Sequence, residues 1–106
     1  ILTLGFLGCT STKPAAEKLK ILSHGMSRLG SGMPVIKGTA KNVSSYTLSY
    51  AEVEVEFLDF NTNPRGTSQN STSNLAAGEI WNFEVIFLGT NPENVDQYRI
   101  RVGTIR

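Results

Sequence analysis

The chain has 106 residues, which is enough for one domain and too few for two. Hydrophobic residues make up 40% of it and charged residues 18%, a balance typical of a folded globular domain. The formal net charge is +1, and the lysines and arginines form no block or stripe, so nucleic-acid binding is not expected.

An apolar segment, residues 1–8, precedes the only cysteine, Cys9, and a polar Ser/Thr/Lys/Pro stretch follows it. The apolar segment is far shorter than the roughly 20 residues that span a bilayer, and it is typical of the end of a secretory signal peptide. The residues up to and including the cysteine, Phe6-Leu7-Gly8-Cys9, resemble a lipobox, the cleavage and acylation motif of bacterial lipoproteins. Gly8 fits that motif, whereas Phe6 and Leu7 depart from its usual residues.

The lipobox resemblance implies that residues 1–8 are a signal-peptide remnant and that Cys9 is the lipidated N-terminus of the mature protein. Residues 9–18 would then be a flexible tether, and residues 19–106 the folded domain. The alternative is an apolar tail or strand with a buried free cysteine.

The first segment of the expected domain, residues 19–28, is ambiguous. Alanine, glutamate, lysine and leucine over residues 15–22 favour a short helix, whereas Gly25 opposes its continuation. We predict an edge strand over residues 19–28, then a turn and a second strand over residues 33–42. On one face of the second strand, Gly38 and its small neighbours allow another strand to approach closely.

Residues 46–60 contain the clearest pattern in the chain, a strict alternation of apolar and acidic side chains. Val53, Val55 and Phe57 fall on one face, and Glu52, Glu54 and Glu56 on the other. A period of two is typical of a half-buried strand in an antiparallel sheet. The acidic row is expected to be a solvated face, with cross-strand pairing to Arg99 and Arg101 or to Lys37 and Lys41 as an option.

Asparagine, proline and glycine predict a turn at residues 61–66, and the polar residues 67–74 predict an exposed strand. A corner at residues 75–79 leads to a strand over residues 80–88 with the heaviest apolar stripe of the chain. The stripe consists of Trp81, Phe83, Val85 and Phe87, and Trp81 is expected to be buried between two sheets.

The last strand is predicted over residues 97–105, with its apolar side chains Tyr98, Ile100 and Val102 facing inward. About six or seven short strands with turns between them, and no β-α-β spacing, predict an all-β domain. The expected fold is an immunoglobulin-like antiparallel β-sandwich.

This pattern resembles the FxLYD domain family, small immunoglobulin-like sandwiches of secreted and surface proteins. The resemblance lies in the strand end at residues 38–42, the motif position at residues 55–59, the corner at residues 75–79, and Phe83 with residues 98–100. Val, Phe and Leu replace the Phe, Leu and Tyr of the naming motif. The family has no established catalytic residues, so the resemblance implies a fold and no site.

Candidate chemistry is sparse. His24 is the only histidine, and no serine stands in a Gly-x-Ser-x-Gly setting, so an enzyme is not expected. Residues 59–63 alternate oxygen side chains as calcium loops do, but Pro64 stands where such a loop needs glycine, and turn chemistry is the favoured interpretation. No metal or other cofactor is predicted. Asn42 and Asn70 each begin a glycosylation triplet, which matters only in a host that glycosylates exported proteins.

The expected function is a non-catalytic binding or accessory module of the cell envelope, held on the membrane by lipid on Cys9. An envelope protein is the expected partner, of unknown identity, and plain secretion is the alternative location. Two alternative functions stay open. One is a β-sandwich that inhibits a protease through loops at one end, and the other is a structural spacer of the envelope.

Overall fold

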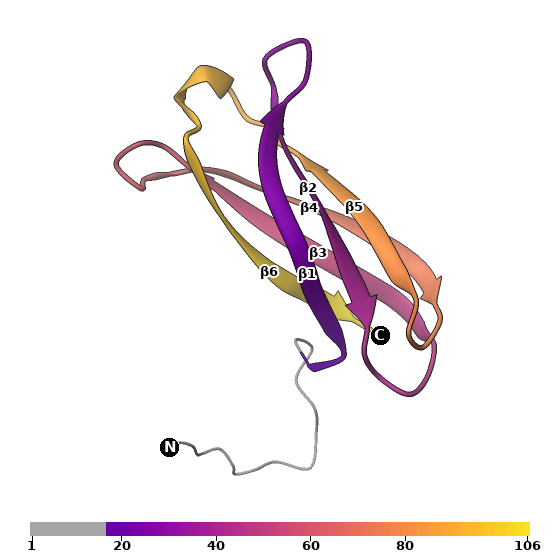
Figure 1. Ribbon diagram of the computed structural model, residues 1–106. Helices are drawn as coiled ribbons and strands as arrows, with labels where there is room; N and C mark the ends of the chain where they lie inside the picture. Colours follow the sequence, from indigo (N-terminus) through magenta and orange to yellow (C-terminus); the bar gives the residue numbers. More distant parts are fainter. Residues whose placement is uncertain (1–16) are drawn as a thin grey trace.

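Six strands account for most of residues 17–106, the part of the chain that the computed structural model describes. They are β1 (Leu19–Arg28), β2 (Pro34–Asn42), β3 (Leu48–Leu58), β4 (Pro64–Leu75), β5 (Ile80–Ile86) and β6 (Gln97–Ile105), with a short 3₁₀ helix η3 (Pro92–Asn94) before the last (Figure 1). Cys9, the predicted signal remnant and most of the predicted tether lie outside the described residues.

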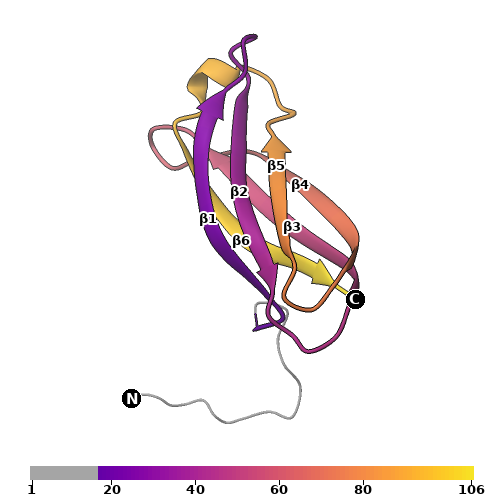
Figure 2. The ribbon, with the colours of Figure 1, turned by 45° about the vertical axis from the view of Figure 1, so that its right-hand side comes forward.

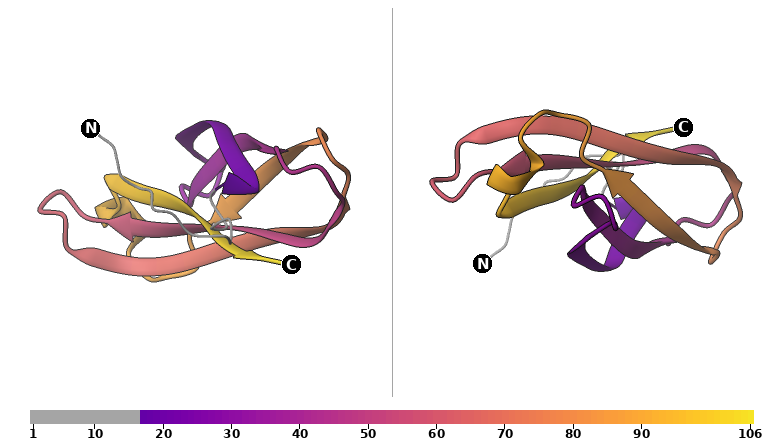
Figure 3. Two further views of the ribbon diagram at one scale, coloured as in Figure 1. Left: turned by 90° about the horizontal axis from the view of Figure 1, so that it is seen from below. Right: turned by 90° about the horizontal axis from the view of Figure 1, so that it is seen from above.

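The strands form two three-stranded sheets, in the orders β1-β2-β5 and β4-β3-β6, and every pairing is antiparallel. Seen from below and from above, the two sheets lie as two layers (Figure 3). The predicted antiparallel β-sandwich is therefore confirmed, with six strands. The helical alternative is wrong for residues 19–22, which belong to β1.

The core lies between the layers and follows the alternation of β3. Its apolar residues Val53, Val55 and Phe57 are fully buried, and the ring of Phe57 meets that of Phe87 edge to face with centroids 5.2 Å apart. Trp81 differs from its prediction: it is only half-buried and packs on the margin of the core, 5.7 Å from the ring of Phe83. It lies near the start of β5, where the sandwich ends.

Several strand boundaries differ from the prediction, and β3 spans Leu48–Leu58 and not residues 46–60. The turn after β3 occupies residues 59–63, and β4 already begins at Pro64, because the Asp59 side chain closes the turn early. β5 ends at Ile86 and not at Leu88, although the Phe87 N–H still donates to the Pro34 carbonyl at 3.0 Å.

A β-bulge in β1 changes which side chains face inward. Leu22 is an extra residue between the pairs Ile21↔Ala40 and Ser23↔Thr39, so the inward positions shift by one residue beyond it. His24 and Met26 consequently face the second sheet, where Met26 packs against the core. A simple period of two along residues 19–28 would not place them there.

A second bulge, in β6, places Gly103 and Thr104 opposite Glu52. The Glu52 side chain folds over Gly103, accepts hydrogen bonds from the Thr104 N–H at 2.9 Å and the Tyr50 hydroxyl at 3.0 Å, and is only 7% exposed. The acidic row is thus solvated at Glu54 and Glu56 but not at Glu52. This corrects the expectation of a uniformly exposed row.

The described chain enters and leaves at the same end of the sandwich (Figures 1 and 2). The Lys18 carbonyl accepts a hydrogen bond from the Val43 N–H at 2.8 Å, and the Arg106 carbonyl accepts one from the Ser49 N–H at 2.8 Å. Val43 directly follows β2, and Ser49 is the second residue of β3. The β1–β2, β3–β4 and β5–β6 connections gather at the opposite end.

Candidate functional site

The opposite end of the sandwich is formed by residues 29–33, 59–63 and 87–96, which we call the loop end. Each of the three segments connects two strands. Together they carry the two large apolar side chains with the highest exposure in the described chain, Phe60 and Leu88. Loops held by a rigid sheet scaffold are the usual place for binding residues. This end is therefore built up residue by residue below.

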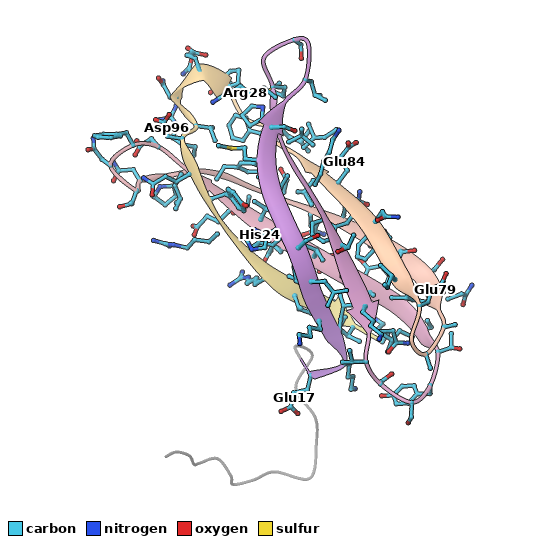
Figure 4. The ribbon with its side chains drawn as sticks, viewed as in Figure 1. Glu17, His24, Arg28, Glu79, Glu84 and Asp96 are labelled. Atoms are coloured by element: carbon cyan, nitrogen blue, oxygen red, sulfur yellow. The ribbon has the colours of Figure 1, made fainter. Side chains whose placement is uncertain are left out.

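Arg28, the last residue of β1, holds two of the three loops together (Figure 4). Its guanidinium donates to the Gly32 and Pro92 carbonyls at 3.0 Å each and to the Val95 carbonyl at 2.6 Å. A guanidinium presents several donors in a fixed plane, so one side chain can satisfy three carbonyls from two loops. Arg28 thus fixes the β1–β2 turn against the β5–β6 segment.

Asp59 organises the third loop. Its Oδ1 accepts hydrogen bonds from the N–H groups of Asn61 and Asn63, both at 2.9 Å, and Thr62 takes a left-handed backbone conformation with φ of 64°. The hydrogen bond from the Asn63 backbone is the main reason that the pKa of Asp59 is lowered from its usual value. This is the turn chemistry that the sequence predicts for Asp59.

Gln97, at the start of β6, fixes the same turn from outside. Its side-chain amide donates to the carbonyls of Asp59 and Phe60, both at 3.1 Å. The backbone of Phe60 is therefore held on two sides, while its side chain is 78% exposed. The aromatic ring stands in solvent on a rigid support.

Two more apolar side chains accompany Phe60 on the loop end. Leu88 is 81% exposed and Leu29 is 37% exposed. Beside Phe60 lies a shallow cleft of about 220 Å³, and polar side chains make up the rest of its lining: Asp59, Asn61, Arg65, Asn94 and Asp96. An aromatic anchor with a polar rim is the composition of a protein-binding surface.

The candidates for catalysis, metal binding and glycosylation are not brought together. His24 lies at mid-strand in β1, where its Nδ1 hydrogen-bonds the Tyr98 hydroxyl at 2.7 Å, and burial raises the pKa of Tyr98. No group of three His, Cys, Asp or Glu side chains in residues 17–106 is placed to hold a metal ion. Asn42 is fully buried and its amide is fully used in hydrogen bonds, so its triplet offers no acceptor for a glycan.

The predicted cross-strand pairing of the acidic row is confirmed for two of its members. Arg99 pairs with Glu56 at 3.2 Å, and Arg101 pairs with Glu54, on the outer face of the β4-β3-β6 sheet. Lys37 pairs instead with Glu84 on the other sheet, at 3.6 Å. All these pairs are solvent-exposed, so they contribute little to stability.

The sequence alone does not predict the arrangement of the loop end. Arg28 and Gln97 are polar residues at strand termini, which resemble any surface position. Phe60 ends the predicted strand of residues 46–60, where an apolar residue is ordinary. The one available signal was the Asp-x-Asn-x-Asn sequence at residues 59–63, which indicates a turn but not what the turn displays.

Comparison with protein families, with curated proteins and with solved structures finds no match to this chain. The resemblance to FxLYD domains therefore stays a prediction. Within residues 17–106, no helix has the length and apolar character of a bilayer-spanning segment.

Proposed function

We propose that this protein is a non-catalytic binding module of the cell envelope, anchored through lipid on Cys9, which contacts a partner protein with its loop end. The observation that carries the proposal is Phe60, an exposed aromatic side chain on a turn whose backbone is held by both Asp59 and Gln97. Aromatic residues are enriched in protein interfaces, where a few side chains carry most of the binding energy.

Rigidity favours this role. A side chain on a mobile loop loses conformational freedom when it binds, and that loss weakens the complex. Here the Asp59 carboxylate orders one of the three loops in the free protein, and the Arg28 guanidinium holds the other two together. The loop end therefore needs little rearrangement on binding.

The direction of the chain also favours this role. The described chain enters the sandwich beside Lys18, at the end opposite Phe60, and the longest dimension of the molecule is 44 Å. An anchor at Cys9 would therefore leave the loop end directed away from the membrane. The partner would be met at a distance from the lipid surface.

The proposal is tested by placing a photo-crosslinking amino acid at position 60 or at position 80 in cells that make the full-length protein. Ile80 is also an exposed apolar residue but lies at the other end of the sandwich. A discrete crosslinked product from position 60 and none from position 80 is the expected result. Loss of that product in a folded Leu88→Ser variant would assign it to the loop end, and equal crosslinking from both positions would refute the proposal.

Protease inhibition is the second candidate function. A rigid turn that exposes one aromatic side chain could also place that side chain in the specificity pocket of a protease. Inhibition of a chymotrypsin-like protease at sub-micromolar concentration, abolished by Phe60→Gly, would favour it over a binding module. The third hypothesis, a structural spacer, predicts that substitution of Phe60 or Leu88 changes no interaction of the protein.

A further inference from the structure

β6 is an edge strand with an open side. Within residues 17–106 it pairs with β3 only, and the register is unbroken from Leu58↔Gln97 to Val53↔Val102. Figure 1 shows β6 at the margin of its sheet. Along an edge strand, alternate N–H and C=O groups point away from the sheet and can pair with another chain.

The other three edges carry features that hinder strand addition. β1 is interrupted by the bulge at Leu22, and β4 begins with Pro64 and a bulge at Arg65. The bulge of β6 lies beyond its residues 97–102. The edges of β4 and β5 lie beside each other and are bridged by the Asn70 side chain, which donates to the Glu84 carbonyl at 2.6 Å. Residues 97–102 of β6 contain no proline, glycine or lysine.

The core is incompletely covered along β6. On β3 the inward side chains are fully buried, whereas the inward side chains of β6 are only half-buried: Tyr98, Ile100 and Val102. The β1 edge opposite reaches them through His24, whose ring meets that of Tyr98 at a centroid distance of 5.6 Å. A strand added to β6 would bury more of these apolar side chains.

The outward side chains of β6 indicate the chemistry of the added strand. Arg99 and Arg101 pair with Glu56 and Glu54 of β3, yet their own side chains are 65% and 75% exposed. A second strand on the open side would meet the same two guanidiniums on its outer face and the same apolar row on its inner face. β3 itself, in which glutamate and valine alternate, shows which sequence suits both the guanidiniums on the outer face and the apolar row on the inner face.

A second copy of this chain does not meet these requirements. Two β6 strands paired antiparallel about Ile100 would place Arg99 of each copy opposite Arg101 of the other, and like charges in opposite positions destabilise a sheet. The occupant that suits this edge is a carboxylate-bearing strand. The charges of β6 thus oppose self-association and favour a different partner.

We infer that the open edge of β6 binds an extended segment of a partner protein in which acidic and apolar residues alternate. The segment would add a fourth strand to the β4-β3-β6 sheet, with backbone hydrogen bonds to residues 97–102 and carboxylates beside Arg99 and Arg101. This surface is separate from the loop end, so the inference does not rest on the function proposed above.

The test uses two synthetic peptides as probes. One copies residues 50–58, which alternate acidic and apolar side chains, and the other has the same composition with its glutamates grouped at one end. Binding to the full-length protein is measured by fluorescence anisotropy, and the site is located by amide hydrogen exchange. The expected result is binding of the alternating peptide alone, with added protection at alternate amides of residues 97–102.

Matched variants decide whether the arginines matter. Arg99→Ala and Arg101→Ala are expected to weaken peptide binding roughly fivefold each, the effect of one exposed ion pair at its upper limit. Lys37→Ala removes an equally exposed, ion-paired cation from the other sheet and is expected to leave binding unchanged. Unfolding midpoints of all three variants verify that they fold.

Four outcomes would overturn the inference. The first two are no binding of the alternating peptide and equal binding of the grouped peptide. The third is new protection in β4 in place of β6, which would mean that the peptide had added to the β4 edge. The fourth is a dimer of the protein alone in analytical ultracentrifugation, with added protection of the β6 amides.

Discussion

The side-chain amide of Asn42, at the end of β2, donates a hydrogen bond of 2.9 Å to the carbonyl of Leu75, at the end of β4, and so joins the two sheets. The same amide donates to the Tyr46 carbonyl at 2.8 Å, and its Oδ1 accepts from the N–H and hydroxyl of Ser44. One fully buried side chain thereby satisfies the polar groups of the β2–β3 connection.

Asn42→Asp keeps the shape but replaces the donor with a carboxylate, which cannot donate to Leu75 or Tyr46. We expect a loss of about 2–4 kcal/mol in the free energy of unfolding, because a buried charge faces two carbonyls. Urea denaturation measures it. Asn82→Asp, on the exposed face of β5, is the control and should change stability by less than about 0.5 kcal/mol. Equal effects at the two positions would contradict the role of Asn42.

Gly38 and Gly25 make a matched pair on neighbouring strands. A Cβ at Gly38 would lie 2.1 Å from the Ser23 carbonyl oxygen and 2.5 Å from the Phe83 ring, whereas a Cβ at Gly25 meets nothing within 4 Å. Gly38→Ala should destabilise the protein by about 1–3 kcal/mol through overpacking. Gly25→Ala should be neutral or stabilise it by up to about 1 kcal/mol. Thermal unfolding of both variants measures the difference in stability. The two variants will be equally stable if β1 and β2 can move apart to accommodate a methyl group at position 38.

Glu52 and Glu56 belong to one acidic row but have different surroundings. Glu52→Ala removes the acceptor for the Thr104 N–H at the β6 bulge and should cost about 1–3 kcal/mol. Glu56→Ala breaks only an exposed pair with Arg99 and should cost about 0–1 kcal/mol. Chemical denaturation of both variants gives the comparison. A larger effect at Glu56 would be incompatible with this assignment.

Asp59 gives the β3–β4 turn a dependence on pH. The pKa of Asp59 is lowered in the folded protein, so its contribution is present above the ordinary value of 3.8 and is lost as the pH falls through the folded-state pKa. Hydrogen exchange of the Asn61 and Asn63 amides should quicken, relative to other turn amides, in that acid range. Asp59→Ala should show the faster exchange of these amides already at neutral pH. If the variant and the parent protein exchange alike at neutral pH, the carboxylate does not order the turn.

The lipidation of Cys9 is decided by intact mass. In a bacterial host the mature protein should begin at Cys9 and carry acyl chains, and Cys9→Ser should leave an uncleaved precursor or a form without them. Fractionation alone is insufficient, because a retained signal also holds a precursor on the membrane. An unmodified thiol, or cleavage at another position, would end the lipoprotein hypothesis.

The strands were predictable where side chains alternate. The alternation over residues 53–57 predicts both the strand and its buried face, because a shift of one residue would turn every valine to solvent. The polar residues of β4 also formed the expected strand, although nothing in their pattern marked where it begins. Trp81 was placed too deep, because a stripe of alternating aromatic residues does not reveal where the sandwich ends.

The loop end and the bulges were not predictable for a physical reason. A bulge is set by how two distant strands match in register, and Leu22 carries no local signal for it. Gly103 carries the general signal of a glycine within a strand, but that signal does not indicate that Glu52 lies over it. The inward position of His24 follows from the first bulge and the burial of Glu52 from the second. Arg28 binds the Pro92 and Val95 carbonyls of the β5–β6 segment, which lie 64 and 67 residues away in the sequence, a distance at which the sequence pattern gives no information.

The entry of the chain beside Lys18 and its exit at Arg106 have a mechanical consequence. Tension applied between these two points would pull β1 away from β2 beginning at Leu19↔Asn42, so that the ladder bonds rupture one after another and not all together. A strand whose hydrogen bonds break one at a time withstands little force. The strand would separate first at the end where the force acts, and the hydrogen bonds of Arg28 at the far end of β1 would be among the last to break.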